Sequence, residues 1–431
     1  MKNTENIFSR KKILIYGLGK SGISSYKFLK KKADVYLFDD NLRNNLNLKK
    51  KLISFKKISK LNFERIIISP GIDILKCRLS KYLKKNLSKI YTDLDVFYSF
   101  YKNKSITITG TNGKSTTAKI LFDILLDQKK DVRLIGNIGN PALSEKKITK
   151  KTIFVIEASS YQLEYSKMFT SKYAAILNIS ADHIERHKSL KKYVDAKFKL
   201  IDSQTKESFA YIKKDDKLIN KKLKLKKFNC KIIKIDVNKN YNFFKKIKNS
   251  YFFSESNKEN LSFVLEISKK LKLKKHLILK TIQKFKGLKY RQQIIFQSNS
   301  LTIINDSKST SFASSIDVLK SKSNIMWLLG GVFKKGDKLN LRKKDFKNVR
   351  AFIYGKNKIF FNNELKGKVK FKNFIKLNDA LKNVFKLIKL EKLKKNVILF
   401  SPCAASFDSF KNFEDRGHYF NQLIKQHLNG K

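Results

Sequence analysis

The sequence is poor in residues that interrupt regular structure or cross-link a chain. Its 431 residues include only three prolines, sixteen glycines, three cysteines and one tryptophan. So few prolines and glycines exclude a low-complexity linker, and the scattered Cys77, Cys230 and Cys403 exclude a disulfide framework or a cysteine zinc site. Hydrophobic residues make up 42% of the chain, which is enough for two to four domains with cores of their own.

Long apolar segments are also missing. No uninterrupted apolar run approaches the length of a membrane span, and the N-terminal residues lack the apolar core and cleavage site of a signal peptide. We therefore expect a soluble, cytoplasmic protein, monomeric and without a membrane partner.

Acidic residues are scarce beside the basic ones. The chain has 35 Asp and Glu against 96 Lys and Arg, a formal net charge of +61. Such a charge is typical of surfaces that bind nucleic acid or anionic membranes, so a basic nucleic-acid-binding ATPase is one alternative. However, the lysines are spread along the whole chain, and Ile, Asn and Phe are abundant as well. We interpret this pattern as compositional drift toward AAA-type codons, expect no specific nucleic acid partner, and interpret the lysine-rich stretch 217–248 as a solvated surface.

The most informative segment is a glycine-containing loop at 110–116. It follows the apolar, β-branched stretch 106–109 and precedes the helix-like stretch 117–126. In such a loop the backbone wraps closely around phosphates, and amide N–H groups at the start of the helix point at them. Lys114 would place a charge on the outer phosphates, and Ser115 or Thr116 would offer a hydroxyl to Mg²⁺. The predicted phosphate-binding residues are Gly110, Thr111, Asn112, Gly113, Lys114, Ser115 and Thr116.

A second glycine loop lies near the N-terminus. An apolar stretch at 12–16 is followed by Gly17, Gly19 and Gly22, then by a helix-like run to Lys30 and an apolar stretch at 35–38 that ends in Asp39. This is the Rossmann-type β-α-β pattern, with an acid about 20 residues past the glycines. Taken alone it suggests NAD or FAD, so an NAD-dependent enzyme is another alternative, although the same turn accepts other phosphorylated ligands.

Apolar stretches of strand length recur along the rest of the chain, each ending in polar residues. They are 65–68, 153–156, 174–179, 301–304, 325–329, 351–354 and 397–400. Their alternation with helix-like segments predicts an α/β fold of three domains: an N-terminal Rossmann-like domain at 1–100, a central P-loop ATPase-like parallel sheet at 101–287 and a C-terminal Rossmann-like domain at 288–431. Glu157 and His183 follow two of the central strands, as Lys114 does, so all three are expected to meet in one cleft.

Five motifs in order carry a family resemblance. They are GTNGKST from Gly110, EASSYQLE from Glu157, LNISADHIERH from Leu177, NDSKSTS from Asn305 and SPCAASFDSFKNFEDRG from Ser401. Along essentially its whole length the chain resembles the Mur ligase family, and the last motif is similar to that of the D-glutamate-adding members. The resemblance implies an ATP- and Mg²⁺-dependent amide ligase of peptidoglycan precursor synthesis, which adds D-glutamate to UDP-N-acetylmuramoyl-L-alanine through an acyl phosphate. Another Mur ligase, or a folylpolyglutamate synthase, is the alternative within the superfamily.

The resemblance also implies roles for individual residues around ATP. The implied catalytic residues are Lys114, Glu157, His183 and Lys197, the last at the position that is carbamylated in the family. The implied Mg²⁺ ligands are Ser115, Glu157 and His183. Beyond the phosphate loop, the implied ATP contacts are Asn257, Asn260, Arg291, Asp306 and Lys308, although Ser256 stands where the family usually has a histidine.

The other two substrates are expected at the two ends of the chain. For the sugar nucleotide, the resemblance implies Ser21 and Asp39, within a region that also holds Lys20, Asp40, Asn41, Ser69 and Gly71, together with Asn137. For D-glutamate it implies Thr310, Lys334, Ser406 and Phe413, with Lys335 as the alternative to Lys334.

Overall fold

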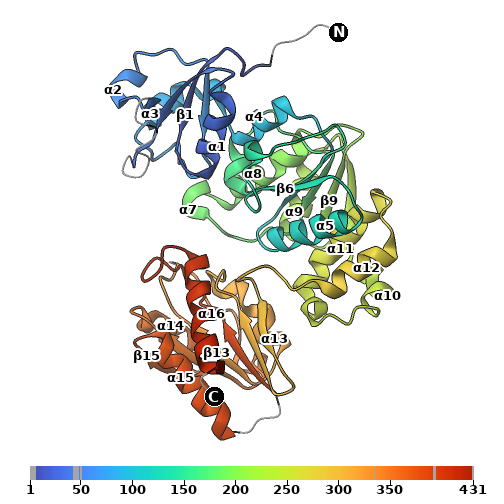
Figure 1. Cartoon of the computed structure of the whole chain (residues 1–431), viewed down its shortest axis with the longest axis vertical. Helices are drawn as coiled ribbons and strands as arrows, with labels where there is room; N and C mark the ends of the chain where they lie inside the picture. The colour runs from blue at the N-terminus through green and yellow to red at the C-terminus, as the bar shows by residue number, and fades with distance from the viewer. Residues whose placement is uncertain (1–5, 42–47, 49–50, 335, 392–394, 430–431) are drawn as a thin grey trace. The chain divides into compact units, whose positions relative to one another are not determined.

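The buried apolar stretches form three β-sheets, each combined with helices. The computed structural model describes residues 6–41, 48, 51–334, 336–391 and 395–429 (Figure 1). The chain divides into an N-terminal unit, Met1–Ile247 with Glu259–Gln283, and a C-terminal unit, Lys248–Lys258 with Lys284–Lys431. The first two sheets belong to the N-terminal unit and the third to the C-terminal unit. The α/β class is therefore confirmed, whereas the domain boundaries at residues 100 and 287 stay predictions.

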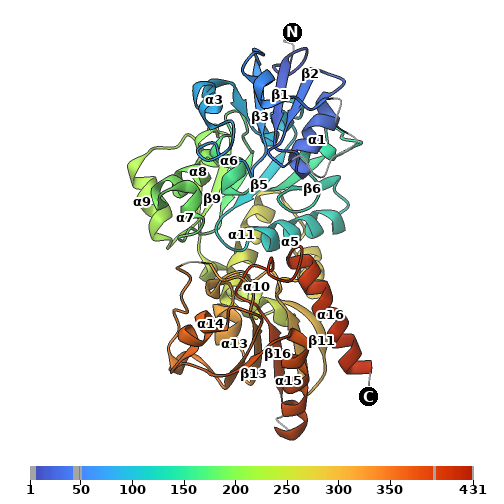
Figure 2. The same ribbon diagram turned by 90° about the vertical axis from the view of Figure 1, so that its left-hand side faces the viewer.

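The first sheet is parallel and has the order β2-β1-β3-β4 (Figure 2). Its strands are β1 (Lys12–Tyr16), β2 (Asp34–Phe38), β3 (Arg65–Ile68) and β4 (Ile90–Tyr91). Because β1 lies between β2 and β3, the chain leaves β1 toward one neighbour and later returns on its other side. Crevices at the carboxyl ends of strands form at such switch points.

The second sheet is also parallel, with the order β10-β9-β8-β5-β7-β6. Its strands are β5 (Ser105–Thr109), β6 (Val132–Gly136), β7 (Ile153–Glu157), β8 (Tyr173–Ile176), β9 (Phe209–Lys213) and β10 (Lys231–Ile235). β5 is buried along its whole length and lies between β7 and β8, so the phosphate loop follows the strand at the switch point. The strand expected at 174–179 ends at Ile176, and residues 177–179 leave the sheet toward this loop.

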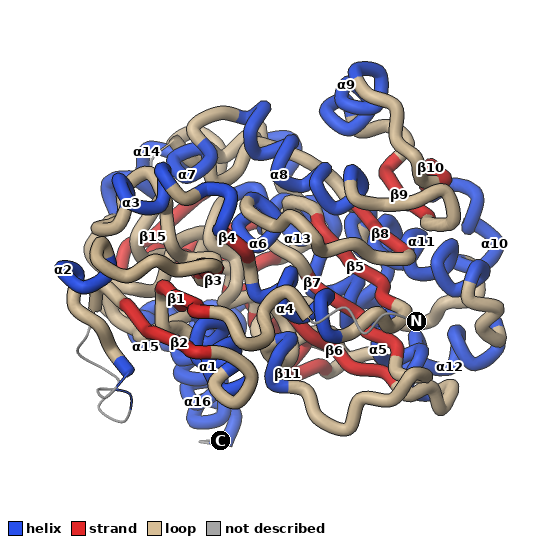
Figure 3. Tube along the Cα trace, turned by 90° about the horizontal axis from the view of Figure 1, so that it is seen from above, coloured by secondary structure: helices blue, strands red, loops and turns tan. Residues whose placement is uncertain are grey.

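Helices flank the strands along the chain (Figure 3). Up to residue 284 they are α1 (Lys20–Leu29), α2 (Phe55–Ile58), α3 (Ser80–Lys85), α4 (Asp93–Phe100), α5 (Lys114–Asp127), α6 (Ser160–Glu164), α7 (Ile184–His187), α8 (Leu190–Asp202), α9 (Lys217–Leu225), α10 (Tyr241–Phe244), α11 (Glu255–Lys270) and α12 (Lys275–Lys284). α5 begins earlier than the sequence pattern indicates, so Lys114 and Ser115 lie in its first turn.

A buried carboxylate joins the part of the N-terminal unit that holds the first sheet to the part that holds the second. Asp95 in α4 is fully buried. Its Oδ1 accepts hydrogen bonds from the Ser166 hydroxyl (2.8 Å) and from the backbone amides of Lys167 (3.0 Å), Met168 (2.7 Å) and Phe169 (3.0 Å). Its Oδ2 accepts from the backbone amide of Thr92 at 2.9 Å, which caps α4. A buried carboxylate with this many donors holds the two segments in a fixed relation.

The third sheet has the order β11-β12-β16-β13-β14-β15. Its strands are β11 (Gln293–Gln297), β12 (Leu301–Asn305), β13 (Ile325–Leu329), β14 (Val349–Tyr354), β15 (Lys370–Phe374) and β16 (Asn396–Phe400). One edge of this sheet departs from the parallel arrangement of a Rossmann-like domain, because β11 runs antiparallel to β12. The two are joined by the short connection 298–300, which is long enough for a hairpin but too short for a parallel crossover.

The helices of this unit are α13 (Ile316–Ser321), α14 (Lys358–Leu365), α15 (Leu377–Glu391) and α16 (Phe413–Asn429). Among the described residues, no helix combines the length and the apolar character needed to cross a membrane.

Candidate active site

The phosphate loop has the backbone conformation that its glycines predict. Gly113 precedes α5 with a φ of +80°, in the left-handed region that favours glycine. A Cβ at this position would lie 2.0 Å from Oδ1 of Asn260, so a side chain there would displace the Asn260 amide. Asn260, which the sequence assigns to ATP, is therefore next to the loop. Asn257, also assigned to ATP, is buried and donates through Nδ2 to the carbonyl of Tyr251 at 2.8 Å.

Two lysine side chains meet at the start of this loop. Nζ of Lys114 donates to the carbonyl oxygens of Gly110 (2.9 Å) and Thr111 (2.8 Å). Nζ of Lys197, in α8, donates to the same Gly110 oxygen at 2.7 Å. Lys197 is only 1% exposed, and burial, followed by the nearby charge of Lys114, holds its pKa well below the ordinary value of a lysine. Two amines beside one carbonyl make a strongly electropositive pocket, as a polyphosphate requires.

Glu157 lies at the end of β7, on the other side of the loop. Its carboxylate is buried and accepts from the Ser115 hydroxyl at 2.7 Å and from Nδ2 of Asn137 at 3.0 Å. Asn137, which the sequence assigns to the substrate, therefore contacts Glu157, and its backbone amide also donates to the Glu157 carbonyl at 2.9 Å. The structure thus joins Ser115, Glu157 and Asn137 in one hydrogen-bonded group that presents hard oxygen ligands.

His183 precedes α7 and has a φ of +54°. It lies beside Asp182, with 3.3 Å between Nε2 and Oδ2, and its ring centroid is 5.0 Å from that of Tyr161. Among the described residues, no three His, Cys, Asp or Glu side chains gather into a group that could hold a metal.

Sequence reasoning missed two residues behind this site, although both belong to segments that it singled out. His187 is buried, and its Nε2 lies 3.0 Å from the Ser160 hydroxyl. Burial, followed by the charge of Arg186, lowers the pKa of His187 to about 4, so it is neutral at pH 7. The hydroxyl of Tyr193 lies 3.1 Å from that of Thr111 in the phosphate loop. The spacing of His183 and His187, one helical turn apart, was the available signal for the first.

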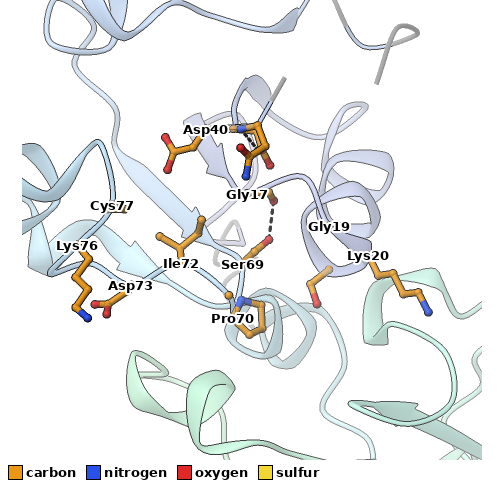
Figure 4. Close-up of a pocket in the computed structure, with 14 residues that line it drawn as sticks. Gly17, Gly19, Lys20, Asp40, Ser69, Pro70, Ile72, Asp73, Lys76 and Cys77 are labelled. Carbon is orange, nitrogen blue, oxygen red and sulfur yellow. Dashed lines mark hydrogen bonds between the residues drawn. The ribbon is translucent and has the colours of Figure 1, made fainter. Parts of the chain in front are cut away.

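A cavity of about 560 Å³ lies at the carboxyl ends of β1, β2 and β3 (Figure 4). It is lined by Gly17, Gly19, Lys20, Ser21, Asp39, Asp40, Asn41, Ser69, Pro70, Gly71, Ile72, Asp73, Lys76 and Cys77. The cavity thus includes the N-terminal residues that the sequence assigns to the sugar nucleotide, but not Asn137. Its other lining residues include Asp73, Lys76 and Cys77. Lys20 and Lys76 lie on opposite sides of the cavity with Ser69 between them (Figure 4).

The glycines shape this cavity. A Cβ on Gly22 would lie 1.8 Å from the Gly17 carbonyl oxygen, so α1 could not approach β1 with a larger residue there. Asp39 accepts from the backbone amides of Leu18 (2.5 Å) and Asn41 (2.8 Å), and so fixes the glycine turn. The Ser21 hydroxyl bonds to Asp93, a buried carboxylate whose pKa is raised by burial.

In the C-terminal unit, the predicted residues lie past the carboxyl ends of β12, β13 and β16. Asp306 is buried, and it accepts from the Ser401 hydroxyl at 2.9 Å and from the Gln292 amide at 3.0 Å. Burial raises the pKa of Asp306 to about 7. The amine of Lys308 lies 4.0 Å from the ring centroid of Phe413, a cation–π contact.

The remaining predicted residues of this unit differ in exposure. Ser406 is buried, Arg291 and Thr310 are half-buried, and Lys334 is exposed. Lys335, the alternative to Lys334, lies outside the described residues. Sequence reasoning missed Arg416, which is fully buried and donates to the carbonyls of Ser307 (2.7 Å) and Ala404 (2.9 Å).

Comparison with known proteins agrees with the family resemblance of the sequence motifs. Residues 108–279 match the Mur ligase middle domain. The chain is 33% identical to the UDP-N-acetylmuramoylalanine–D-glutamate ligase of Rickettsia felis, over 98% of each chain. It is 32% identical to the ligase of the same name from Francisella tularensis subsp. novicida, over 96% of each.

Solved structures share the fold at lower identity. The UDP-N-acetylmuramate-alanine ligase of Thermotoga maritima matches with a TM-score of 0.56 and 16% identity, over 98% of this chain and 100% of that one. The MurF ligase of Thermotoga maritima, solved in complex with ADP, matches with a TM-score of 0.55 and 13% identity, over 98% of this chain and 100% of that one.

Proposed function

The chain belongs to the Mur ligase family, and we propose that it is the ATP-dependent ligase that joins D-glutamate to UDP-N-acetylmuramoyl-L-alanine during peptidoglycan precursor synthesis. The observation that carries the proposal is the match, along the whole chain, to relatives named for this reaction. The arrangement of Lys114, Lys197, Glu157 and Ser115 around a phosphate loop supports it with the chemistry that the reaction needs.

The reaction has two steps. The terminal phosphoryl group of ATP passes to the alanyl carboxylate, which gives ADP and an acyl phosphate. The amine of D-glutamate then attacks the acyl carbon, the C–O bond to phosphate breaks, and an amide and phosphate are formed. Phosphoryl transfer depends on positioning and charge neutralisation more than on covalent help from the protein. The loop amides would hold the phosphates, and Lys114 would turn from the Gly110 and Thr111 carbonyls to the outer phosphates of ATP.

Magnesium fits the donor set on one side of the loop. Glu157 and Ser115 supply a carboxylate and a hydroxyl, the oxygen ligands that Mg²⁺ prefers, and Asn137 fixes the carboxylate. Because the protein supplies so few ligands, phosphate oxygens and water would complete the coordination shell. The ion would neutralise charge on the transferred phosphoryl group. His183 is proposed for a second ion, as the family resemblance implies.

Lys197 is proposed as a carbamylated lysine. The lowered pKa favours the neutral amine, which is the form that attacks CO₂. In that step the N–C bond forms and the nitrogen releases a proton. The carbamate would place an anion beside the positive charge of Lys114.

The other two substrates are proposed at the ends of the chain. The cavity of the first sheet, with Ser21 at the start of α1, suits the diphosphate of a nucleotide sugar. Thr310, Lys334, Ser406 and Phe413 are proposed for D-glutamate, and Asn257, Asn260, Arg291, Asp306 and Lys308 for ATP. A cytoplasmic location and a monomeric state stay predictions.

A coupled phosphate-release assay tests the function. The full chain is incubated with ATP, Mg²⁺ and UDP-N-acetylmuramoyl-L-alanine, and D-glutamate, L-lysine, diaminopimelate and L-alanine are added one at a time. Phosphate release that depends on D-glutamate alone is the expected result. Turnover with one of the other amino acids in its place would assign the chain to a sister ligase, and no D-glutamate-dependent turnover would overturn the proposal.

A further inference from the structure

The tyrosine at the end of β1 reaches from the core of the first sheet into the nucleotide cavity. The ring of Tyr16 is fully buried, and its centroid lies 5.2 Å from that of Phe38 on the neighbouring strand. Its hydroxyl donates to Oδ2 of Asp40 at 2.5 Å. The thiol of Cys77, which lines the same cavity, also bonds to this hydroxyl. Tyr16 thus connects a rigid strand to an aspartate at the cavity wall.

The carboxylates of the adjacent residues Asp39 and Asp40 have different hydrogen-bond partners. Both oxygens of Asp39 accept from backbone amides, those of Leu18 and Asn41. Asp40 has one oxygen on Tyr16, and no described residue donates to the other oxygen, Oδ1. Asp40 is exposed and lines the cavity, where Figure 4 shows it with Ser69, Ile72 and Cys77. Asp40 therefore presents an acceptor oxygen to the cavity, whereas each oxygen of Asp39 already accepts one hydrogen bond from the loop backbone and keeps a second acceptor site.

The hydroxyl of Tyr16 has a fixed donor role. Burial, followed by the hydrogen bond to Asp40, raises the pKa of Tyr16 far above the ordinary value of a tyrosine. The phenol therefore keeps its proton and donates it to Asp40. An ionised carboxylate offers only acceptor sites. A ligand group that meets Oδ1 must consequently bring its own hydrogen.

We infer that Tyr16 is a positioning residue, which holds the Asp40 carboxylate so that its other oxygen accepts a hydrogen bond from an N–H or O–H group of the nucleoside. The inference rests on the proposed function, because it assumes that the cavity holds the nucleotide end of a uridine-diphosphate sugar. Uridine has three groups with this chemistry: the N3–H of the uracil ring and the ribose 2′- and 3′-hydroxyls. The Asp40 oxygen is assigned to one of the first two. Cytosine differs at N3, which is an acceptor and would repel the carboxylate.

Calorimetric titration of the full chain with UDP, CDP and 2′-deoxy-UDP tests the inference and separates the two groups. If N3–H is read, the wild type binds UDP more tightly than CDP, and Tyr16→Phe weakens UDP about tenfold with little change for CDP. Asp40→Asn then lessens the preference, because an amide both donates and accepts. If the 2′-hydroxyl is read, Tyr16→Phe weakens UDP and CDP alike and leaves 2′-deoxy-UDP nearly unchanged.

Tyr36→Phe is the matched control. Tyr36 lies on the neighbouring strand and its hydroxyl also bonds to an aspartate, Asp34, but neither residue lines the cavity. Removal of the Tyr36 hydroxyl should leave the affinities for UDP, CDP and 2′-deoxy-UDP unchanged. In steady-state assays Tyr16→Phe should raise KM for the nucleotide substrate without lowering kcat, which a loss of folded protein would not do. Asp40→Asn provides a second test if Tyr16→Phe fails to fold, since Asp40 is exposed.

The outcomes are distinguishable. Equal weakening of all three nucleotides by Tyr16→Phe, or unchanged ratios in both variants while the wild type binds UDP, would overturn the inference and leave the proposed function standing. If the wild type binds none of the nucleotides, the proposed function itself fails at this cavity.

Discussion

At the scale of single residues, the carbonyl oxygen of Gly110 is the shared hydrogen-bond acceptor of two lysines of the proposed ATP site. Nζ of Lys114 and Nζ of Lys197 both donate to this one oxygen. Like charges at such a distance repel each other, and the repulsion grows as water is excluded. In the proposed mechanism an incoming phosphate would draw Lys114 away, and loss of a proton would let Lys197 react.

Lys114→Ala should abolish turnover and leave the fold intact. Its amine donates to two loop carbonyls, so its removal takes away charge stabilisation of the phosphates rather than core packing. We expect kcat to fall by at least about 10²-fold in the phosphate-release assay. Lys119→Ala on the same helix, which removes an ion pair with Asp123, is the control and should keep full activity. Substantial activity in Lys114→Ala would contradict the role.

Lys197→Ala should also be inactive, but added short carboxylates should restore part of its activity. If a carbamate is the working form, short carboxylates such as formate or acetate fit the space of the deleted side chain and restore part of the activity. The measurement is phosphate release against carboxylate concentration. Lys114→Ala, treated in the same way, should show no rescue, which distinguishes a missing anion from a missing cation. Absence of rescue in Lys197→Ala would weaken the carbamate proposal.

At the scale of elements, the phosphate loop depends on a glycine for two separate reasons. Gly113→Ala combines an unfavourable φ of +80° with a Cβ 2.0 Å from Asn260. Gly367→Ala has a similar φ of +74° but open space around the Cβ, so it measures the backbone cost alone. We expect Gly367→Ala to lose about 1 kcal/mol of stability with normal activity. Gly113→Ala should in addition raise KM for ATP about tenfold or more, since Asn260 and the loop must move apart. Equal behaviour of the two variants would refute the steric argument.

The buried carboxylate of Asp95 in α4 is the second feature at this scale. Asp95→Ala leaves the backbone amides of Lys167, Met168 and Phe169 without their acceptor, and removes the buried carboxylate. We expect the free energy of unfolding of the N-terminal unit to fall by about 3–5 kcal/mol in guanidinium titrations followed by circular dichroism. The only tryptophan, Trp327, is buried in the C-terminal unit, and its fluorescence transition should not move.

The control for Asp95→Ala is Asp195→Ala, which removes a partly exposed ion pair with Lys222 and should cost less than about 1 kcal/mol. If both variants lose the same small free energy of unfolding, the Asp95 carboxylate does not hold the two segments together.

At the scale of the whole molecule, the net charge of +61 should make stability depend on salt. Some acidic residues form ion pairs, such as Asp195 with Lys222 and Asp202 with Lys226. Because there are far fewer acidic than basic residues, most lysines have more positive than negative neighbours. Raising NaCl from 10 to 150 mM shortens the screening length from about 30 Å to about 8 Å. We expect Tm to rise by about 2–5 °C in thermal scans, which corresponds to roughly 1–2 kcal/mol. A Tm that falls or stays constant would show that the charge is already balanced by its arrangement.

The strands show which parts of the fold the sequence reveals. The apolar stretches correctly predict the central strands β1, β5, β7, β12, β13 and β16. The strands that they miss are mostly at sheet edges: β4, β6, β10, β11 and β15, together with the inner strand β9. An edge strand faces solvent on one side, so it tolerates lysine, as in KIIKI of β10 and KFKNF of β15, and loses its apolar signal.

The amino-acid sequence was enough to indicate the reaction class, because the phosphate loop, Glu157, His183 and the motif from Ser401 are short local patterns whose order resembles that of the Mur ligases. Which atoms those residues contact depends on the tertiary structure. It placed Lys197 beside Lys114 across 82 intervening positions, put Asn137 on Glu157, and gave Asp39 and Asp40 different hydrogen-bond partners. These pairings depend on how strands and helices pack, and packing is set by many weak contacts between segments far apart in the chain, which no local pattern records.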